Sequence, residues 1–238
     1  LQFPSGDGPS QMAVGDFNGD GVVDVAVTNT GVNTVSVSLG NGDGTFSAPR
    51  QFSVGAFRAP NPVGDDANLL TYRRDVLAED FNHDGLLDLV VTNFDSADVS
   101  VLLGHGDGTF QPQRRFDAAA FPLGVTSGDV NGDGHLDLVV IDSPEINVPN
   151  KLAVLLGRGD GTFLPQKLQE LPKILFLAVV ALGDFDKDGN LDLVAGGGIN
   201  EGLDIFRGMG DGSFKYVERV SGSRQAASLA VVDLNVDG

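Results

Sequence analysis

Short apolar runs alternate along the whole chain with stretches rich in Gly and Asp. The clearest runs are DVAVTN, DLVVTN, DLVVID and DLVAGG, which begin at Asp24, Asp88, Asp137 and Asp192. They have the length of strands and are rich in Val and Leu, as buried strands are. The pattern therefore predicts an all-β fold of many short strands joined by tight turns.

Each run belongs to a unit in which four strands are expected. In the first unit the pattern predicts strands at Gln11–Gly15, Asp24–Asn29, Thr34–Leu39 and Phe46–Val54. The turn before the fourth strand reads GDGTF or GDGSF in all four units, and its glycines permit a positive φ. In the later units the fourth strand is expected to start at Phe110, Phe163 and Phe214. The recurring Phe is interpreted as a core residue that packs between neighbouring units.

The units repeat about every 50 residues, a period that favours a β-propeller built of four-stranded antiparallel blades. About four complete blades are present. We place them at residues 10–56, 75–120, 123–170 and 174–221, with partial blade strands at 1–4 and 226–238. The whole chain is thus expected to be one propeller segment.

Between the first and second expected strands, each unit carries the motif Asp-x-Asn/Asp-x-Asp-Gly-x-x-Asp. Calcium binds six to eight oxygens in flexible geometry, and a Gly at position 6 allows a loop to fold around it. Side chains at positions 1, 3, 5 and 9 and the carbonyl at position 7 are the candidate ligands, which predicts about four Ca²⁺ sites. They are Asp16, Asn18, Asp20, Val22 and Asp24; Asp80, Asn82, Asp84, Leu86 and Asp88; Asp129, Asn131, Asp133, His135 and Asp137; and Asp184, Asp186, Asp188, Asn190 and Asp192. A fifth copy begins at Asp233.

Two other interpretations of the motif were weighed. An EF-hand needs a bidentate Glu at position 12 and flanking helices. Position 12 is instead apolar, being Val27, Val91, Val140 and Ala195. A metal-free turn rich in Asp, Asn and Gly is the remaining alternative. Four copies in one register disfavour it, because their crowded carboxylates would repel one another without a cation.

The formal net charge is −18, and the candidate loops hold much of it. Nothing in so acidic a chain would neutralise phosphates, so nucleic acid is not an expected partner. The chain has no Cys, which excludes a disulfide framework and thiol catalysis. The longest apolar run, Ile174–Leu182, is too short to cross a bilayer. No direct membrane insertion is expected.

The run GDFNGDG followed by VSLGNGDGTF, together with its later copies, resembles the FG-GAP/VCBS repeats of bacterial extracellular proteins, which are related to the propeller of integrin α subunits. The resemblance covers essentially the whole chain. It implies a propeller with calcium between the first two strands of certain blades, and a role in adhesion or in recognition of protein or carbohydrate. Such rings commonly have about seven blades, so the chain is expected to be part of a larger ring and to act outside the cell or at its surface.

Three functions stay open at this point. The first is a non-enzymatic calcium-binding module for extracellular adhesion or recognition of a protein or glycan. The second is the propeller of a polysaccharide lyase or another secreted glycan-active enzyme, and the third is a structural spacer in a large adhesin. Two insertions, at residues 57–74 and 143–151, are candidate recognition surfaces. The first contains Arg58, Tyr72, Arg73 and Arg74.

Two further sequence features are interpreted as parts of turns and loops rather than as binding sites. Arg158-Gly159-Asp160 spells an RGD tripeptide, but it lies within the repeated turn, where the other units have Asn41, His105 and Met209 in place of Arg158. The histidines, His83, His105 and His135, show no metal-ligand spacing. No Ser/His/Asp arrangement is evident, so an enzyme is the less favoured interpretation.

Overall fold

The computed structural model describes residues 5–56, 75–142, 150–171, 179–196, 202–221 and 229–231. The first two sheets contain β1 (Pro9–Gly15), β2 (Asp24–Asn29), β3 (Thr34–Ser38), β4 (Arg50–Ser53), β5 (Val76–Glu79), β6 (Asp88–Asn93), β7 (Asp98–Leu102) and β8 (Arg114–Asp117). The other two contain β9 (Pro122–Gly128), β10 (Asp137–Asp142), β11 (Lys151–Leu155), β12 (Lys167–Glu170), β13 (Val179–Gly183), β14 (Asp192–Gly196), β15 (Leu203–Gly208) and β16 (Phe214–Val220).

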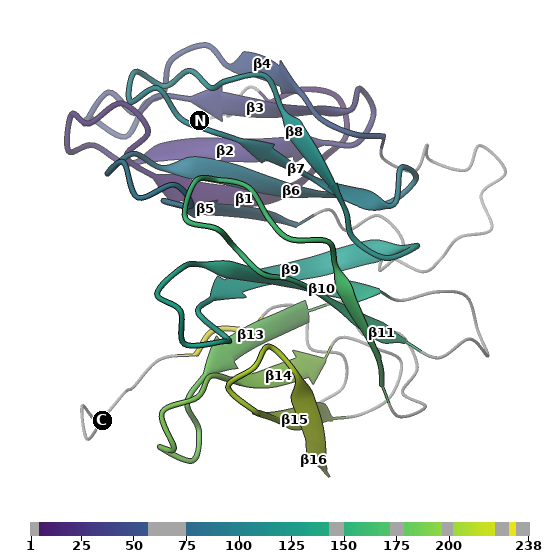
Figure 1. Ribbon diagram of the computed structural model, residues 1–238. Coiled ribbons are helices and arrows are strands. Elements are labelled where there is room, and N and C mark those ends of the chain that lie inside the picture. The colour runs from purple at the N-terminus through teal and green to yellow at the C-terminus, as the bar shows by residue number, and fades with distance from the viewer. Residues whose placement is uncertain are drawn as a thin grey trace, which may run out of the picture.

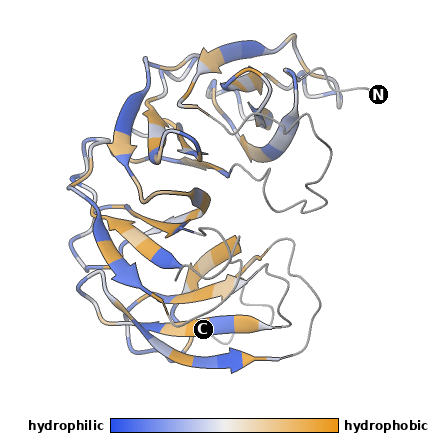
Figure 2. Ribbon diagram, turned by 90° about the vertical axis from the view of Figure 1, so that its right-hand side faces the viewer, coloured by the Kyte–Doolittle hydropathy of each residue, from blue (hydrophilic) through white to orange (hydrophobic). Residues whose placement is uncertain are grey.

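These strands form four separate four-stranded antiparallel sheets, each in sequential order. We call them blade 1 (β1–β4), blade 2 (β5–β8), blade 3 (β9–β12) and blade 4 (β13–β16). The blades follow one another along an open arc, with the first strand of each blade toward the inside (Figures 1 and 2). The prediction of an all-β propeller with four-stranded blades is confirmed.

Burial rises toward the middle strands of each blade. Every residue of β6 and β10 is buried, whereas three of the four residues of β4, β8 and β12 are exposed. A strand that is buried on both faces reads as a continuous apolar run rather than as an alternating one. This explains the continuous apolar runs at residues 89–91 of β6 and 138–141 of β10.

The hydrophobic core lies between blades rather than within them. One cluster joins blades 1 and 2 and includes Val35, Val37, Leu89 and Val91. A second joins blades 2 and 3, and a third joins blades 3 and 4. Each blade therefore depends on its neighbours for burial, as is usual in repeat architectures.

The recurring Phe of the GDGTF turn closes these clusters, as predicted. Phe110 of blade 2 packs edge-on against Phe17 and Phe52 of blade 1, with ring centroids 5.8 and 5.2 Å apart. Phe163 of blade 3 packs in the same way against Phe81 and Phe116 of blade 2, at 6.0 and 5.4 Å. Such pairs add about 0.5–1.5 kcal/mol beyond the burial of their area.

The expected start of the fourth strand is wrong in blades 1 to 3. Phe46, Phe110 and Phe163 each form an isolated bridge to a glycine, and the strand itself begins four residues later. A proline intervenes in each case, and it has no N–H to donate to the ladder. These prolines are Pro49, Pro112 and Pro165. Blade 4 lacks one, and there the strand begins at Phe214 as expected.

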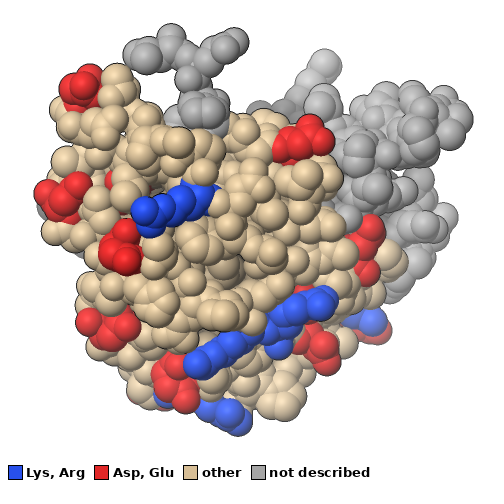
Figure 3. Space-filling view, turned by 90° about the horizontal axis from the view of Figure 1, so that it is seen from above, with Lys and Arg blue, Asp and Glu red and all other residues tan. Residues whose placement is uncertain are grey.

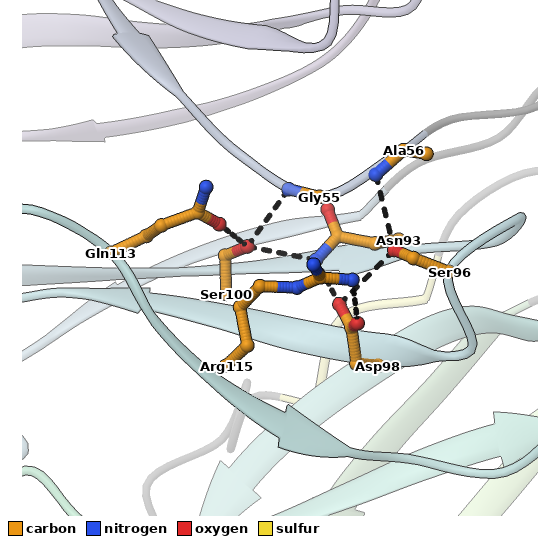
Figure 4. A network of polar contacts seen from close by, with 8 residues as sticks. All are labelled: Gly55, Ala56, Asn93, Ser96, Asp98, Ser100, Gln113 and Arg115. Atoms are coloured by element: carbon orange, nitrogen blue, oxygen red, sulfur yellow. Dashed lines mark hydrogen bonds and ion pairs between the residues drawn. The ribbon is translucent and has the colours of Figure 1, made fainter.

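A buried polar joint ties the end of blade 1 to blade 2 (Figure 4). The N–H of Gly55 donates to Ser100 Oγ at 3.1 Å, and the N–H of Ala56 donates to Ser96 Oγ at 3.0 Å. Asn93 donates to both Asp98 and Ser100. Two further side chains hold these acceptors in place: Gln113, just before β8, accepts a hydrogen bond from Ser100, and Arg115 of β8 forms an ion pair with Asp98.

Charge is distributed unevenly over the blades. The four outer strands carry most of the described Lys and Arg residues, namely Arg50, Arg114, Arg115, Lys167, Lys215 and Arg219. Figure 3 shows a row of basic side chains on one face, with acidic side chains scattered around its margin. The loops between first and second strands, by contrast, are dominated by Asp.

Several expected features lie outside the described residues. These are the insertion at 57–74 with Arg58, Tyr72, Arg73 and Arg74, most of the insertion at 143–151, the partial strand at 1–4 and the motif copy that begins at Asp233. Among the described residues, no helix has the length and apolar character needed to cross a membrane.

Candidate metal loops

The four motif copies form the connections between the first and second strands of the four blades. We call them loop 1 (residues 16–24), loop 2 (80–88), loop 3 (129–137) and loop 4 (184–192). Each begins directly after the first strand and ends on the first residue of the second strand. Because all blades share one strand order, the four loops occupy equivalent positions along the arc.

The aspartate at position 1 closes each loop on itself. In loop 1, Asp16 Oδ1 accepts hydrogen bonds from the N–H groups of Gly19 (2.7 Å) and Asp20 (3.2 Å), and its Oδ2 accepts one from Gly21 (2.8 Å). The N–H of Gly21, assisted by the other loop amides, lowers the pKa of Asp16. The carboxylate is therefore held ionised, as a cation ligand must be.

Positions 3 and 5 are also oriented by the loop. In loop 1, Asn18 Oδ1 accepts from the N–H of Asp20 at 3.0 Å, and its amide donates to Asp20 Oδ2 at 2.9 Å. Asp20 Oδ1 in turn accepts from the N–H of Val22 at 2.8 Å. Loops 2 and 3 repeat these contacts. The oxygens of three side chains are thus preorganised on one short turn.

Position 6 needs glycine for its backbone conformation. The φ angles there are 80°, 84°, 85° and 90° at Gly21, Gly85, Gly134 and Gly189. An added Cβ would meet nothing within 4 Å at any of them. Conformation, not lack of space, therefore excludes other residues.

The aspartate at position 9 connects the loop to the GDGTF turn of its own blade. In blade 2, Asp88 Oδ2 accepts from the N–H of Phe81 at 3.0 Å, and Oδ1 accepts from the N–H of Gly104 at 2.8 Å. The same two bonds recur at the other position-9 residues, Asp24, Asp137 and Asp192. Side-chain patterns alone could not reveal this second role of a predicted ligand.

Burial changes the acidity of two of these carboxyls. It raises the pKa of Asp88 to about 6 and that of Asp137 to about 6, against the opposing effect of their two amide donors. The negative charges at positions 1 and 5 add to the increase. A bound divalent cation would reverse this balance by stabilising the ionised form.

Loop 4 offers the densest group of carboxylates. One oxygen each of Asp184, Asp186 and Asp188 lies within 4.8 Å of the others. Two oxygens bound to one calcium ion at 2.3–2.6 Å can be up to about 5 Å apart. The trio therefore fits a single calcium ion. Arg207 of β15 forms an ion pair with Asp186, so a protein cation already contacts this loop.

Loops 1 to 3 are joined to the next blade by a backbone hydrogen bond. The carbonyl at position 2 accepts from the last glycine of the following GDG turn: Gly108 to Phe17 at 2.9 Å, Gly161 to Phe81 at 3.2 Å and Gly212 to Val130 at 3.1 Å. The N–H of the same position-2 residue is held by position 9. Each of these loops therefore lies in the contact between two blades.

The RGD tripeptide belongs to such a turn, as interpreted from the sequence. Asp160 accepts hydrogen bonds from the N–H and Oγ1 of Thr162 at 2.9 and 2.5 Å, and Asp43 makes the same pair of contacts with Thr45. The side-chain bond from Thr162 lowers the pKa of Asp160. The carboxylate of the tripeptide is thus used to form the turn.

Sequence spacing missed one association. His83 of loop 2 and His135 of loop 3 are 52 positions apart, yet His135 Nδ1 lies 3.5 Å from His83 Nε2. The contact exists because adjacent blades bring their loops together. The sequence spacing of the histidines gave no indication of this contact.

Comparison with solved structures finds a similar fold in part of a larger protein. The chain is similar to an Agrocybe aegerita lectin described as recognising non-reducing terminal N-acetylglucosamine, with 21% identity, a TM-score of 0.53 and coverage of 87% of this chain and 51% of that one. The chain thus spans about half of the lectin. Weaker similarities are to a Photorhabdus luminescens Tc holotoxin pore (20% identity, TM-score 0.43, 78% and 8% coverage) and to the V. cholerae biofilm matrix protein Bap1 (18%, 0.39, 91% and 39%).

No curated protein matches the chain. A family model does: the model described as FG-GAP-like repeat matches residues 16–66, 80–140, 143–195 and 184–238. These four matches span all four loops and most of the sequence. The chain therefore belongs to the FG-GAP-like repeat family.

Proposed function

We propose that this chain is a non-enzymatic, calcium-stabilised propeller segment that recognises a protein or glycan outside the cell. The observation that carries the proposal is the repeated loop architecture. In all four loops the aspartate at position 1 accepts hydrogen bonds from the N–H groups of positions 5 and 6, and three of the loops also contact the following blade.

Calcium suits these loops because every candidate ligand is an oxygen. The side chains at positions 1, 3 and 5, the carbonyl at position 7 and the carboxylate at position 9 would hold it. Each position-9 oxygen accepts one N–H and retains a lone pair for an ion. The ion would offset the repulsion among the carboxylates and fix the loop on which the neighbouring blade rests.

The calcium proposal is tested by thermal unfolding of the purified chain in 1 mM CaCl₂ and after exhaustive treatment with chelator. At ten times a Kd of about 10⁻⁴ M, one site would add about 1.4 kcal/mol, and several such sites add more. We expect Tm to fall by several degrees in chelator and to recover when calcium, but not sodium, is restored. Equal Tm values in both conditions would refute calcium binding.

Recognition is proposed from the family and from the way the fold presents its loops. Rigid blades hold many exposed connections, and binding residues commonly lie on such loops. Among possible ligands a glycan is the first to test, with terminal N-acetylglucosamine as the first probe because the structurally similar lectin is described as recognising it. Calcium-loaded protein should bind a subset of a glycan array. An empty array together with an empty pull-down would favour a spacer role.

A further inference from the structure

His83 and His135 form an exposed pair of imidazoles at the junction of blades 2 and 3. Their rings have centroids 5.6 Å apart and an interplanar angle of 43°. Nε2 of His83 and Nδ1 of His135 face each other at 3.5 Å. Neither imidazole belongs to the calcium proposal, in which residue 135 contributes only its backbone carbonyl.

The separation of the two nitrogens matches a metal chelate. Imidazole nitrogens bind zinc at about 2.0–2.1 Å, and a tetrahedral angle then separates two ligands by about 3.3–3.4 Å. The observed distance between the two nitrogens is within about 0.1–0.2 Å of that separation. Imidazole is a ligand for zinc, copper and nickel, whereas calcium takes oxygen. The pair therefore differs in metal preference from the loops that carry it.

The backbone places both rings. His83 occupies position 4 of loop 2 with φ 58°, where loops 1 and 3 have Gly19 and Gly132. His135 lies over Gly159, which belongs to the GDGTF turn of the same blade. A Cβ on that glycine would be 2.4 Å from His135 Nδ1. The absence of a side chain at residue 159 thus leaves room for the ring. The pair is set by two loops and one turn that all belong to well-packed blades.

The surrounding charge favours a cation. The Asp133 carboxylate, at position 5 of loop 3, interacts electrostatically with His135. Asp84 directly follows His83 in sequence. Clustered carboxylates raise the local concentration of divalent ions near a surface.

We propose that His83 and His135 together bind one divalent transition-metal ion, of the zinc or copper class, as a clamp between blades 2 and 3. The two imidazoles supply two ligands, and water fills the remaining positions. The two imidazoles lie on loops 2 and 3 but are not among the oxygen ligands proposed for calcium, so the two kinds of metal use different atoms. The open positions of the histidine site can accept a ligand from a bound molecule.

The test measures Cu²⁺ and Zn²⁺ binding to the full chain in the presence of saturating calcium, which occupies carboxylate sites. The variants take residues that other repeats carry at the same positions, so that each loop can fold: His83→Gly as at Gly19, and His135→Asn as at Asn190. The matched control is His105→Asn, as at Asn41 in the equivalent turn.

We expect the unaltered chain to bind one Zn²⁺ in competition with a chromophoric chelator, and its Cu²⁺ complex to show hyperfine coupling to two nitrogens in electron paramagnetic resonance. Each variant of the pair should weaken binding by about tenfold or more, because one of two protein ligands is lost. The double variant should bind no more tightly than either single one, and His105→Asn should bind as the unaltered chain does.

The proposal is overturned if both variants of the pair bind zinc as tightly as the unaltered chain, or if His105→Asn lowers the affinity equally. A Cu²⁺ spectrum without nitrogen coupling has the same consequence. Loss of calcium binding in a separate titration would refute the calcium loops but leave the result for the histidine pair unaffected.

Discussion

Loops 1 to 3 and loop 4 share one backbone design but differ at the blade interface and in charge. Position 2 of the first three loops, Phe17, Phe81 and Val130, is at most 5% exposed, whereas Phe185 of loop 4 is 43% exposed. The following GDG turn covers the first three, and no such turn covers loop 4 within the described residues. Whether a loop is buried therefore depends on the turn of the neighbouring blade that covers it.

The charge difference lies at position 3. Loops 1 to 3 have an Asn whose amide donates to the Asp at position 5. Loop 4 has Asp186, which cannot donate, and Arg207 pairs with it. The comparison shows two ways to relieve carboxylate crowding: an amide inside the loop, or a cation brought from a neighbouring strand.

The largest effect on stability is expected when the position-9 aspartate is removed from a loop that the following blade covers. Asp88→Ala leaves two buried N–H groups, those of Phe81 and Gly104, without an acceptor, which should cost about 3 kcal/mol of the free energy of unfolding. Asp192→Ala should cost less, because the N–H of Phe185 lies nearer to solvent. Urea unfolding measures both, with the exposed Asp95→Ala as a control that changes stability by at most about 0.5 kcal/mol.

Equal losses for Asp88→Ala and Asp192→Ala would contradict the difference between covered and uncovered loops. A loss for Asp95→Ala as large as that for Asp88→Ala would show that charge removal alone, rather than the buried amides, is being measured.

The next effect concerns pH in the metal-free chain. Because the pKa of Asp88 and of Asp137 is raised to about 6, the native state binds more protons than the unfolded state between about pH 4 and pH 6. These groups should therefore make stability fall as pH rises through that interval, with little further change above it. Urea unfolding in chelator across this range checks the sign.

Two additions sharpen the pH experiment. The variant Asp88→Asn, which does not titrate, should show a shallower decline than the unaltered chain. Calcium should oppose the decline at the higher pH values, since it favours the ionised carboxylates. A stability that rises from pH 4 to pH 6 in chelator would contradict the assigned shifts.

A smaller effect on stability is expected from removing the arginine that pairs with the extra aspartate of loop 4. Arg207→Ala should lower metal-free stability by at most about 1 kcal/mol, because the arginine is half exposed and its ion pair is screened. The same change frees Asp186 for an ion, so the calcium affinity of loop 4 should rise. Calorimetric titration with calcium compares Arg207→Ala with Lys215→Ala, which removes a nearby cation on β16. The comparison separates the local effect from a general change in charge. Unchanged affinity would contradict the role given to Arg207.

An effect of similar, small size is expected at position 4. Gly132 has φ 75° in loop 3, whereas Lys187 has φ 61° in loop 4. Gly132→Lys should destabilise by about 1 kcal/mol, the cost of a left-handed conformation for a residue with a Cβ. Lys187→Gly should raise the free energy of unfolding by less than that amount, because glycine also adds entropy to the unfolded chain. Thermal unfolding compares the two, and a stabilising Gly132→Lys would show that this conformation carries no strain.

The sequence predicted those features that depend on local pattern. Second strands such as Asp88–Asn93, the loop glycines and the packing of Phe110 all follow from repeated residue types at fixed spacing. The predicted start of β4 at Phe46 is four residues too early, because Pro49 interrupts the pairing between that residue and the strand. Contacts between residues far apart in the sequence were not predictable. Arg207 of β15 pairs with Asp186 of loop 4, and His83 contacts His135 because blades 2 and 3 are adjacent.

The hydrogen bonds from Gly108, Gly161 and Gly212 to the preceding loops also have a mechanical meaning. They connect neighbouring blades, so a force that separates two blades must break these bonds as well as the apolar contacts between the blades. Forced unfolding is governed by the barrier to opening such contacts. If calcium stiffens the loops, the calcium concentration would then influence how much tension the row of blades withstands before one blade detaches, independently of what the module binds.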